Sequence, residues 1–213
     1  MGILAALAWV VFGITLVIRG IAGNGGLLAA EMLREAPPEA TGLPAEDYPG
    51  VGAMAAEYLT GKREAFQYVP AGGTGVFQAH EAAHMADVRG LIRLDTAVCI
   101  ISLGAAAALA AFGLWRRGGR AGFLRGALWG LRGILCAAGA LGAWALINFD
   151  GFFITFHRVA FTNEGWLLNP RTDLLIRLMP ESFFIRLGII GTAWAAGFLV
   201  LTGIGVRILR KFS

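Results

Sequence analysis

The stretch TAVCIISLGAAAALAAFGLW, from Thr96 to Trp115, carries no charged residue and is long enough to cross a membrane as a helix. At 1.5 Å per residue, about 20 helical residues span a hydrocarbon layer of roughly 30 Å. Three further apolar runs have similar lengths, at about residues 2–19, 126–147 and 187–206. Of these, the run 126–147 carries a charge in its interior, Arg132, about two turns from one end. The sequence therefore predicts an all-α integral membrane protein with four transmembrane helices.

The composition supports a membrane protein and argues against a soluble one. Of the 213 residues, 57% are hydrophobic and only 15% are charged, whereas an ordinary soluble domain carries about 25% charged residues. The first run has no preceding Lys or Arg and no following A-x-A-like cleavage site, so we expect an uncleaved helix. Cys99 and Cys136 fall inside apolar runs, where they are expected to pack as small hydrophobic residues.

The distribution of charge predicts how the chain crosses the membrane. The hairpin 116–125 holds four arginines and no acid, and all 14 acidic residues lie between Glu31 and Asp95 or between Asp150 and Glu181. The positive-inside rule places this hairpin and both termini in the cytoplasm. We expect one membrane domain, 1–213, with extracytoplasmic segments at about 23–93 and 149–185 that contain short interfacial helices. The basic residues form no stripe typical of nucleic-acid binding, so no nucleic acid is expected as a partner.

The first outer segment is expected to hold a loop with short turns over 35–50, followed by an amphipathic helix that begins near Val51 and stops at Gly61. A second helical pattern begins near Val76 and runs into the second membrane helix, which puts His84 near the lipid–water boundary. The second outer segment is rich in aromatic residues, as at membrane interfaces. Within it, Asn169 and Pro170 are expected to begin a short helix that ends at Pro180.

The stretch HEAAHMADV, from His80 to Val88, contains the pattern H-E-x-x-H of zinc proteases. On a helix, His80 and His84 share one face, and Glu81 could act as general base on a metal-bound water. A third ligand could come from the second outer segment, where the candidates are His157, Glu164 and Glu181. One hypothesis is therefore a membrane zinc metalloprotease.

A longer pattern favours a different enzyme. Three segments carry this pattern: EAAHMADV, FHRVAFTNEGWLLNPRTDLLIRLMPESFF and TGLPAEDYPGVGAMAAEYLTG. They resemble the bacterial lipoprotein intramolecular transacylases, the Lit family. His80 matches no position of the family pattern, and Asn169 stands where an Asp is expected. The matching positions are Glu81, His84, Met85, Asp87, Val88, Phe156, His157, Phe161, Asn163, Trp166, Pro170, Asp173 and Pro180.

The resemblance implies an acyltransferase that acts on diacylglyceryl-modified lipoproteins in the cell membrane. The sn-2 acyl chain would move to the α-amino group of the N-terminal Cys and give the lyso-form lipoprotein. We expect no metal or other cofactor. Membrane lipid is an expected partner, and the oligomeric state stays open. A non-enzymatic membrane scaffold or sensor is a further alternative.

The residues that match the family suit such chemistry. A neutral His84 could take a proton from the substrate amine, and His157, Asn163 or a backbone N–H could donate to the oxyanion. Glu81 or Asp87 could orient the ring of His84. The alternatives are a helix-terminal or surface charge for Glu81 and a salt bridge to Arg89 or Arg93 for Asp87. The expected substrate-binding residues, for which membrane anchoring is the alternative role, are Phe156, Phe161, Trp166 and Arg158.

Overall fold

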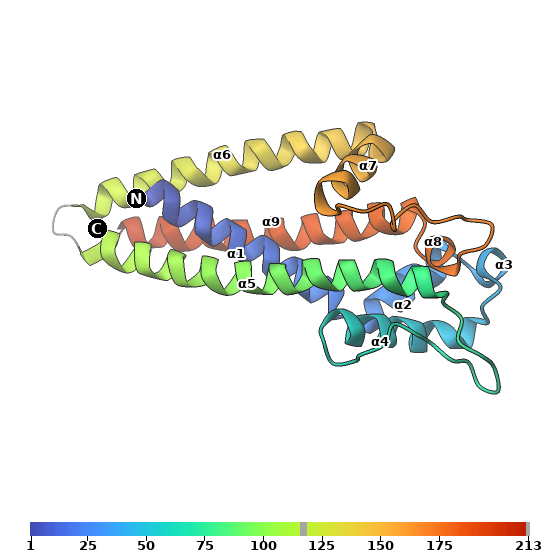
Figure 1. Ribbon diagram of the computed structural model, residues 1–213. Coiled ribbons are helices and arrows are strands. Elements are labelled where there is room, and N and C mark those ends of the chain that lie inside the picture. Colours follow the sequence, from blue (N-terminus) through green and yellow to red (C-terminus); the bar gives the residue numbers. More distant parts are fainter. Residues whose placement is uncertain (116–118, 212–213) are drawn as a thin grey trace. The chain divides into compact units, whose positions relative to one another are not determined.

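The computed structural model describes residues 1–115 and 119–211, and the regular elements in this part of the chain are all helices (Figure 1). Four of them are long and apolar enough to cross a membrane, which confirms the predicted class. Arg116 and Arg117 of the predicted hairpin lie outside the described residues. The four long helices are α1 (Gly2–Ala22), α5 (Ala79–Trp115), α6 (Arg120–Ile147) and α9 (Glu181–Lys211).

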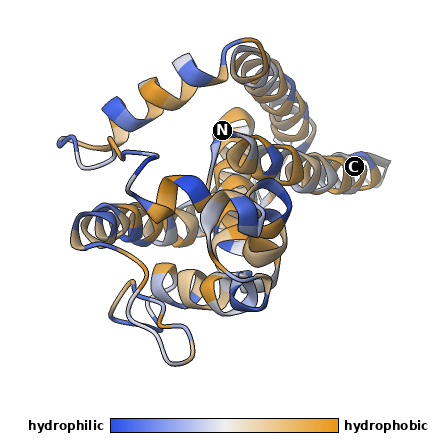
Figure 2. Cartoon of the chain, turned by 90° about the vertical axis from the view of Figure 1, so that its right-hand side faces the viewer, coloured by the Kyte–Doolittle hydropathy of each residue, from blue (hydrophilic) through white to orange (hydrophobic). Residues whose placement is uncertain are grey.

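The shorter elements lie between α1 and α5 and between α6 and α9 in the sequence. They are α2 (Gly25–Glu35), α3 (Pro38–Thr41), η1 (Ala45–Asp47), α4 (Tyr48–Leu59), α7 (Phe149–Ala160) and α8 (Leu174–Leu178). The chain divides into two compact units. The span unit comprises residues 1–17, 95–147 and 191–213, and the histidine unit comprises residues 18–94 and 148–190. Apolar residues predominate along the long helices, and hydrophilic residues gather in the loops (Figure 2).

The span unit is held together by close helix contacts around α1. The indole Nε1 of Trp9 donates to Thr202 Oγ1 at 2.8 Å, and the Trp9 ring stacks on Phe198 at 5.2 Å. Gly13 makes this stacking possible, because a Cβ there would lie 2.4 Å from the Phe198 ring. Small residues at such crossings are typical of helix packing in lipid, where van der Waals contact drives association.

The histidine unit has its own apolar core, built largely on α2 and α4. The two helices touch backbone to backbone, since a Cβ on Gly52 would lie 2.4 Å from the carbonyl oxygen of Gly25. The largest fully buried side chains of this core are those of Met32, Tyr48, Val51, Met54, Leu178 and Phe183. This packing gives the short helices a stability that their length alone does not provide.

Several local predictions for the two outer segments need correction. The stretch 35–50, predicted as a loop with short turns, contains the single-turn helices α3 and η1. The following helix, α4, begins at Tyr48 rather than Val51. The predicted stop is present, because α4 ends at Leu59 and Gly61 adopts a left-handed backbone with φ of 82°. Helices α2 and α7 were not predicted.

Helix α8 is shorter than the sequence suggested. It begins at Leu174 instead of Pro170, because the side chain of Asn169 accepts a hydrogen bond from Arg171 N at 3.0 Å and forms a local turn. Asp173 Oδ2 accepts from the backbone N–H of Asn169 at 2.8 Å and closes this turn. Asn169 is therefore a turn residue, which is the common competing use of an Asn side chain.

Candidate active site

The first turn of α5 is fixed by Glu81, which is fully buried. One carboxylate oxygen accepts from the backbone N–H of Gln78 at 2.7 Å, which is the capping-box arrangement at a helix start. The other accepts from the backbone N–H of Leu175 at 2.6 Å, in the first turn of α8. A single carboxylate thus caps two helices, because the first N–H groups of any helix lack intrahelical partners.

Helix α5 continues without a break into its apolar stretch (Figure 1). His84 lies near its N-terminus, ahead of the run 96–115, and is 8% exposed. Its Nδ1 is buried and has no hydrogen-bond partner within the described residues. Met85, the next residue, packs into the core of the histidine unit and anchors this part of the helix.

His157 reaches the site from α7. The side chain of Asn148 caps that helix by accepting from Gly151 N at 2.9 Å. His157 is buried, and its Nδ1 lies 2.8 Å from the carbonyl oxygen of Phe153, one turn earlier. Because a carbonyl oxygen only accepts, Nδ1 carries the proton in this contact. In the neutral ring, Nε2 is then the nitrogen with a free lone pair.

The two histidine rings are brought together inside an aromatic enclosure. Their centroids lie 6.1 Å apart. Phe161 packs edge-on against the His84 ring at 5.4 Å, and the His157 ring contacts Phe153 at 4.1 Å and Trp166 at 5.0 Å. These rings displace water from both imidazoles and place them in a medium of low polarity.

This enclosure changes the acidity of both histidines. Burial lowers the pKa of His84 below its usual value, and the neighbouring His157 lowers it further, whereas Asp87 acts in the opposite direction. Burial also lowers the pKa of His157, partly offset by its hydrogen bond to Phe153. Both rings are therefore neutral at pH 7, the state in which an imidazole can accept a proton.

Asp87 and Asn163 form a direct link between α5 and the loop that follows α7. The side-chain amide of Asn163 donates to Asp87 Oδ2 at 2.9 Å. The amide oxygen of Asn163 also accepts from Gly165 N at 2.9 Å, which orders the loop just before Trp166. The structure therefore joins two residues that the sequence marked separately.

The remaining predicted residues lie at the margin of the enclosure. Phe156 packs edge-on against His157 at 5.3 Å, yet 49% of it is exposed. Arg158 is exposed and makes no hydrogen bond or ion pair with other described residues. Phe156 thus offers an apolar face next to the histidines, and Arg158 offers a free cation on the same helix.

The first histidine of HEAAH has a different environment. His80 Nε2 lies 2.9 Å from Asp173 Oδ2, and about half of the His80 side chain is exposed. Across residues 1–115 and 119–211, no group of three or more His, Cys, Asp and Glu is arranged to hold a metal ion. His80 and His84 therefore have separate partners, although they share the helical spacing of a zinc motif.

Phe153 is the site residue that sequence reasoning missed. Its carbonyl oxygen fixes the His157 ring and its side chain covers that ring. The available signal was the spacing of four residues between Phe153 and His157, which brings one over the other only in a helix. Because the aromatic stretch was attributed to an interfacial belt, this helix was not predicted.

Fold and site together define a multi-pass helical membrane protein with a buried pair of neutral histidines. The family model described as lipoprotein intramolecular transacylase Lit matches residues 3–184. The chain therefore belongs to the Lit family and is an acyltransferase whose family membership implies lipoprotein substrates. This result favours an enzyme over the scaffold and sensor alternatives.

Solved structures of a Lit protein share this fold. The membrane integral lipoprotein intramolecular transacylase Lit from Bacillus cereus is 18% identical, with a TM-score of 0.81, over 100% of this chain and 96% of that chain. A form with a histidine-to-arginine mutation has a TM-score of 0.75 and 20% identity, over 99% and 89% of the two chains. A histidine-to-alanine form has a TM-score of 0.79 and 19% identity, over 99% and 92%. No curated protein sequence matches the chain.

Proposed function

We propose that this protein moves the sn-2 acyl chain of an S-diacylglyceryl lipoprotein to the α-amino group of its N-terminal Cys. The product is the lyso-form lipoprotein. The observation that carries the proposal is the buried pair of His84 and His157, with ring centroids 6.1 Å apart. Two neutral imidazoles, enclosed by aromatic rings, suit a reaction that moves protons between an amine and an ester.

The reaction needs no second acyl donor, and its bonds and protons balance within one substrate molecule. The amine loses one proton to a histidine, and its nitrogen attacks the ester carbonyl carbon. The N–C bond forms as the C–O bond to glycerol breaks, and the histidine returns the proton to the glycerol oxygen. Because both reacting groups belong to one molecule, most of the catalytic effect is orientation.

The partners of the two histidines support direct transfer rather than an acyl-enzyme. Within the described residues, neither ring has a Ser, Thr or Cys side chain as a hydrogen-bond partner. A covalent mechanism would need such a nucleophile within reach of its base. Cys99 and Cys136 both lie in apolar stretches of α5 and α6.

The hydrogen bond of His157 supports catalytic roles that are the reverse of those expected from the sequence, with His157 as the base and His84 as the oxyanion donor. With its proton on Nδ1, neutral His157 presents a lone pair at Nε2 and suits the role of base. For His84, Nδ1 is buried without a partner, and an orphaned acceptor is more common in proteins than an orphaned N–H. That favours a proton on Nε2 of His84, which can then donate to the oxyanion.

The other matched residues have supporting roles in this proposal. Glu81 fixes α8 against the start of α5. The hydrogen bond between Asn163 and Asp87 fixes the loop that contains Trp166 against α5. Phe156, Phe161 and Trp166 bind acyl chains, and Arg158 binds polar groups of the lipoprotein or of neighbouring lipid. We place the site on the extracytoplasmic face of the bacterial cell membrane, with both termini inside, on the basis of the charge distribution.

A labelled lipopeptide tests the proposal directly. The substrate is a synthetic diacylglyceryl lipopeptide with an isotopically labelled sn-2 chain, mixed with purified protein and unlabelled phospholipid. We expect mass spectrometry to find the label on the N-terminal amine, with the product mass equal to the substrate mass. An unlabelled N-acyl chain, drawn from phospholipid, would contradict the intramolecular reaction.

A further inference from the structure

Helix α6 carries a stripe of two cations and one aromatic ring. Arg125, Trp129 and Arg132 are spaced by four and three residues, so they lie on one face of the helix. The guanidinium of Arg132 lies 5.2 Å from the centroid of the Trp129 ring. All three side chains are exposed, and the stripe extends over roughly 10 Å along the helix.

Among the residues that the structure describes, these cations have no acidic partner. The span unit contains one acidic residue, Asp95, which lies in the middle part of α5 (Ala79–Trp115). No ion pair joins Arg132 to an acidic side chain in the part of the chain that the structure describes. An arginine inside an apolar run is unfavourable unless an anion or the lipid headgroup layer compensates its charge.

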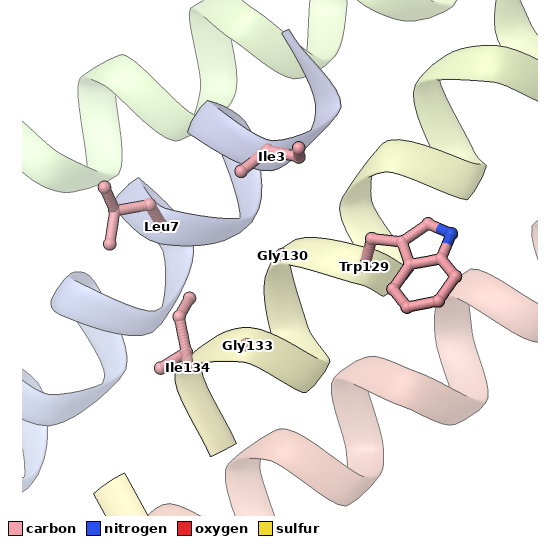
Figure 3. Close-up of a pocket in the computed structure, with 6 residues that line it drawn as sticks. All are labelled: Ile3, Leu7, Trp129, Gly130, Gly133 and Ile134. Carbon is pink, nitrogen blue, oxygen red and sulfur yellow. The ribbon is translucent and has the colours of Figure 1, made fainter. Parts of the chain in front are cut away.

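An apolar groove between α1 and α6 adjoins the stripe, and Trp129 belongs to both. Its lining consists of Ile3, Leu7, Trp129, Gly130, Gly133 and Ile134 (Figure 3). Gly130 lets the helices approach, since a Cβ there would lie 3.0 Å from Ala6 Cβ. Gly133 leaves the groove open, because a Cβ there would have no atom within 4 Å.

We propose that this groove binds one acyl chain of an anionic phospholipid, and that Arg132 and Arg125 hold the phosphate and headgroup. The apolar lining matches the hydrocarbon chain, and the unpaired arginines match the negative charge. Basic residues beside transmembrane helices attract anionic lipids, each with an affinity gain of about fivefold near the membrane surface. Every residue of this site belongs to the span unit, and none of them is a residue of the histidine site.

Lipid binding to the purified, delipidated full-length protein tests the proposal. Phosphatidylglycerol and phosphatidylcholine with identical acyl chains are titrated separately, and native mass spectrometry measures the bound fraction. We expect phosphatidylglycerol to bind with at least about fivefold higher affinity. Equal affinity for the two lipids would overturn the proposal.

Two variants distinguish the contribution of the apolar groove to lipid binding from that of the arginine charge. Gly133→Leu places a large side chain in the groove at a position where an added Cβ meets no atom within 4 Å, and it should lower phosphatidylglycerol binding several-fold. Gly139→Leu is the control, since a Cβ on Gly139 of α6 also meets no atom within 4 Å. Arg132→Gln should reduce the preference for phosphatidylglycerol by about fivefold. Arg207→Gln, which removes an equal charge from α9, should retain the preference. If either control matched its test variant, lipid would be binding non-specifically and the site would be refuted.

Discussion

Nδ1 of His157 lies 2.8 Å from the carbonyl oxygen of Phe153. This contact joins a side chain to the backbone of its own helix, so it fixes the ring without help from another element. It also assigns the proton to Nδ1 and leaves Nε2 as the basic nitrogen of the neutral ring. His84 has no such contact at Nδ1, and the two histidines are therefore not equivalent.

Glutamine substitutions should reveal this difference. Glutamine retains an N–H donor but cannot act as a base near neutral pH. His157→Gln should lower kcat by roughly 10²–10⁴-fold, the usual value of general-base catalysis. His84→Gln should retain more activity than His84→Ala, because an oxyanion donor remains. The reverse pattern, with His157→Gln the more active, would return the role of base to His84.

His80 provides the test of the zinc hypothesis. His80→Ala removes a side-chain contact with Asp173 in which about half of the His80 side chain is exposed, so we expect activity within a few-fold of wild type and a small loss of stability. His84→Ala should lose most of the activity. EDTA should leave the wild-type rate unchanged. Equal losses at His80 and His84, together with inhibition by EDTA, would indicate a metalloenzyme.

The rate should depend on pH through the two histidines and through the substrate amine. Burial lowers the pKa of both His84 and His157 below the ordinary 6.5, so each ring stays neutral at pH 7 and becomes protonated only at lower pH. Activity should therefore fall on an acidic limb whose midpoint lies below pH 6.5. The substrate α-amine, with a pKa of about 8, should give a second rise near that pH. A midpoint above pH 6.5 for the acidic limb would be inconsistent with burial of the pair.

Asp87→Asn identifies the contribution of His84 to this profile. The carboxylate of Asp87 raises the pKa of His84, so its removal should move the acidic limb to lower pH. Asn163→Ala is the matched control, because it breaks the hydrogen bond to Asp87 but leaves the charge in place. If both variants shifted the limb equally, the cause would be loop geometry rather than charge.

Glu81 should matter through folding. Glu81→Ala leaves the backbone N–H groups of Gln78 and Leu175 without acceptors, and each buried orphan costs about 1–3 kcal/mol. We expect a lower Tm in detergent for Glu81→Ala and a smaller drop for Glu81→Gln, which preserves one acceptor oxygen. Activity of the folded fraction of Glu81→Gln should stay near wild type. Normal stability with lost activity would instead indicate a direct catalytic role.

Membrane orientation can be checked by labelling. Thr74 lies in an exposed loop of the histidine unit, and Thr74→Cys in a background without Cys99 and Cys136 should react with an impermeant maleimide in intact cells. Arg117→Cys in the basic hairpin should react only after the cells are opened. Labelling of the two positions in the opposite order would reverse the proposed topology.

The four spans and the class of the fold were predictable because each depends on local composition. An uncharged run such as Thr96–Trp115 has few structures open to it in lipid, where every backbone group must be bonded internally. The continuity of α5 was equally visible, because only one isolated Gly, Gly90, and no Pro lie between His84 and that run.

The errors arose where long-range contacts decide the structure. Glu81 looks like a first-turn charge on α5, and its bond to Leu175 N depends on where α8 lies. Asn169 had two possible hydrogen-bonding uses, and the turn closed by Asp173 decided between them. The pairing of Asp87 with Asn163 likewise requires the loop after α7 to return to α5. Neither propensity nor periodicity contains this information.

The double capping by Glu81 has a consequence for how a lipid-anchored substrate gains entry. Separating α8 from α5 would strand a buried negative charge, at a cost of several kcal/mol. The same corner is closed again by the bond between His80 and Asp173. The end of the segment 161–180 next to Glu81 is therefore fixed. We expect a bulky lipid substrate to enter near its other end, where Asn163 and Phe156 are exposed.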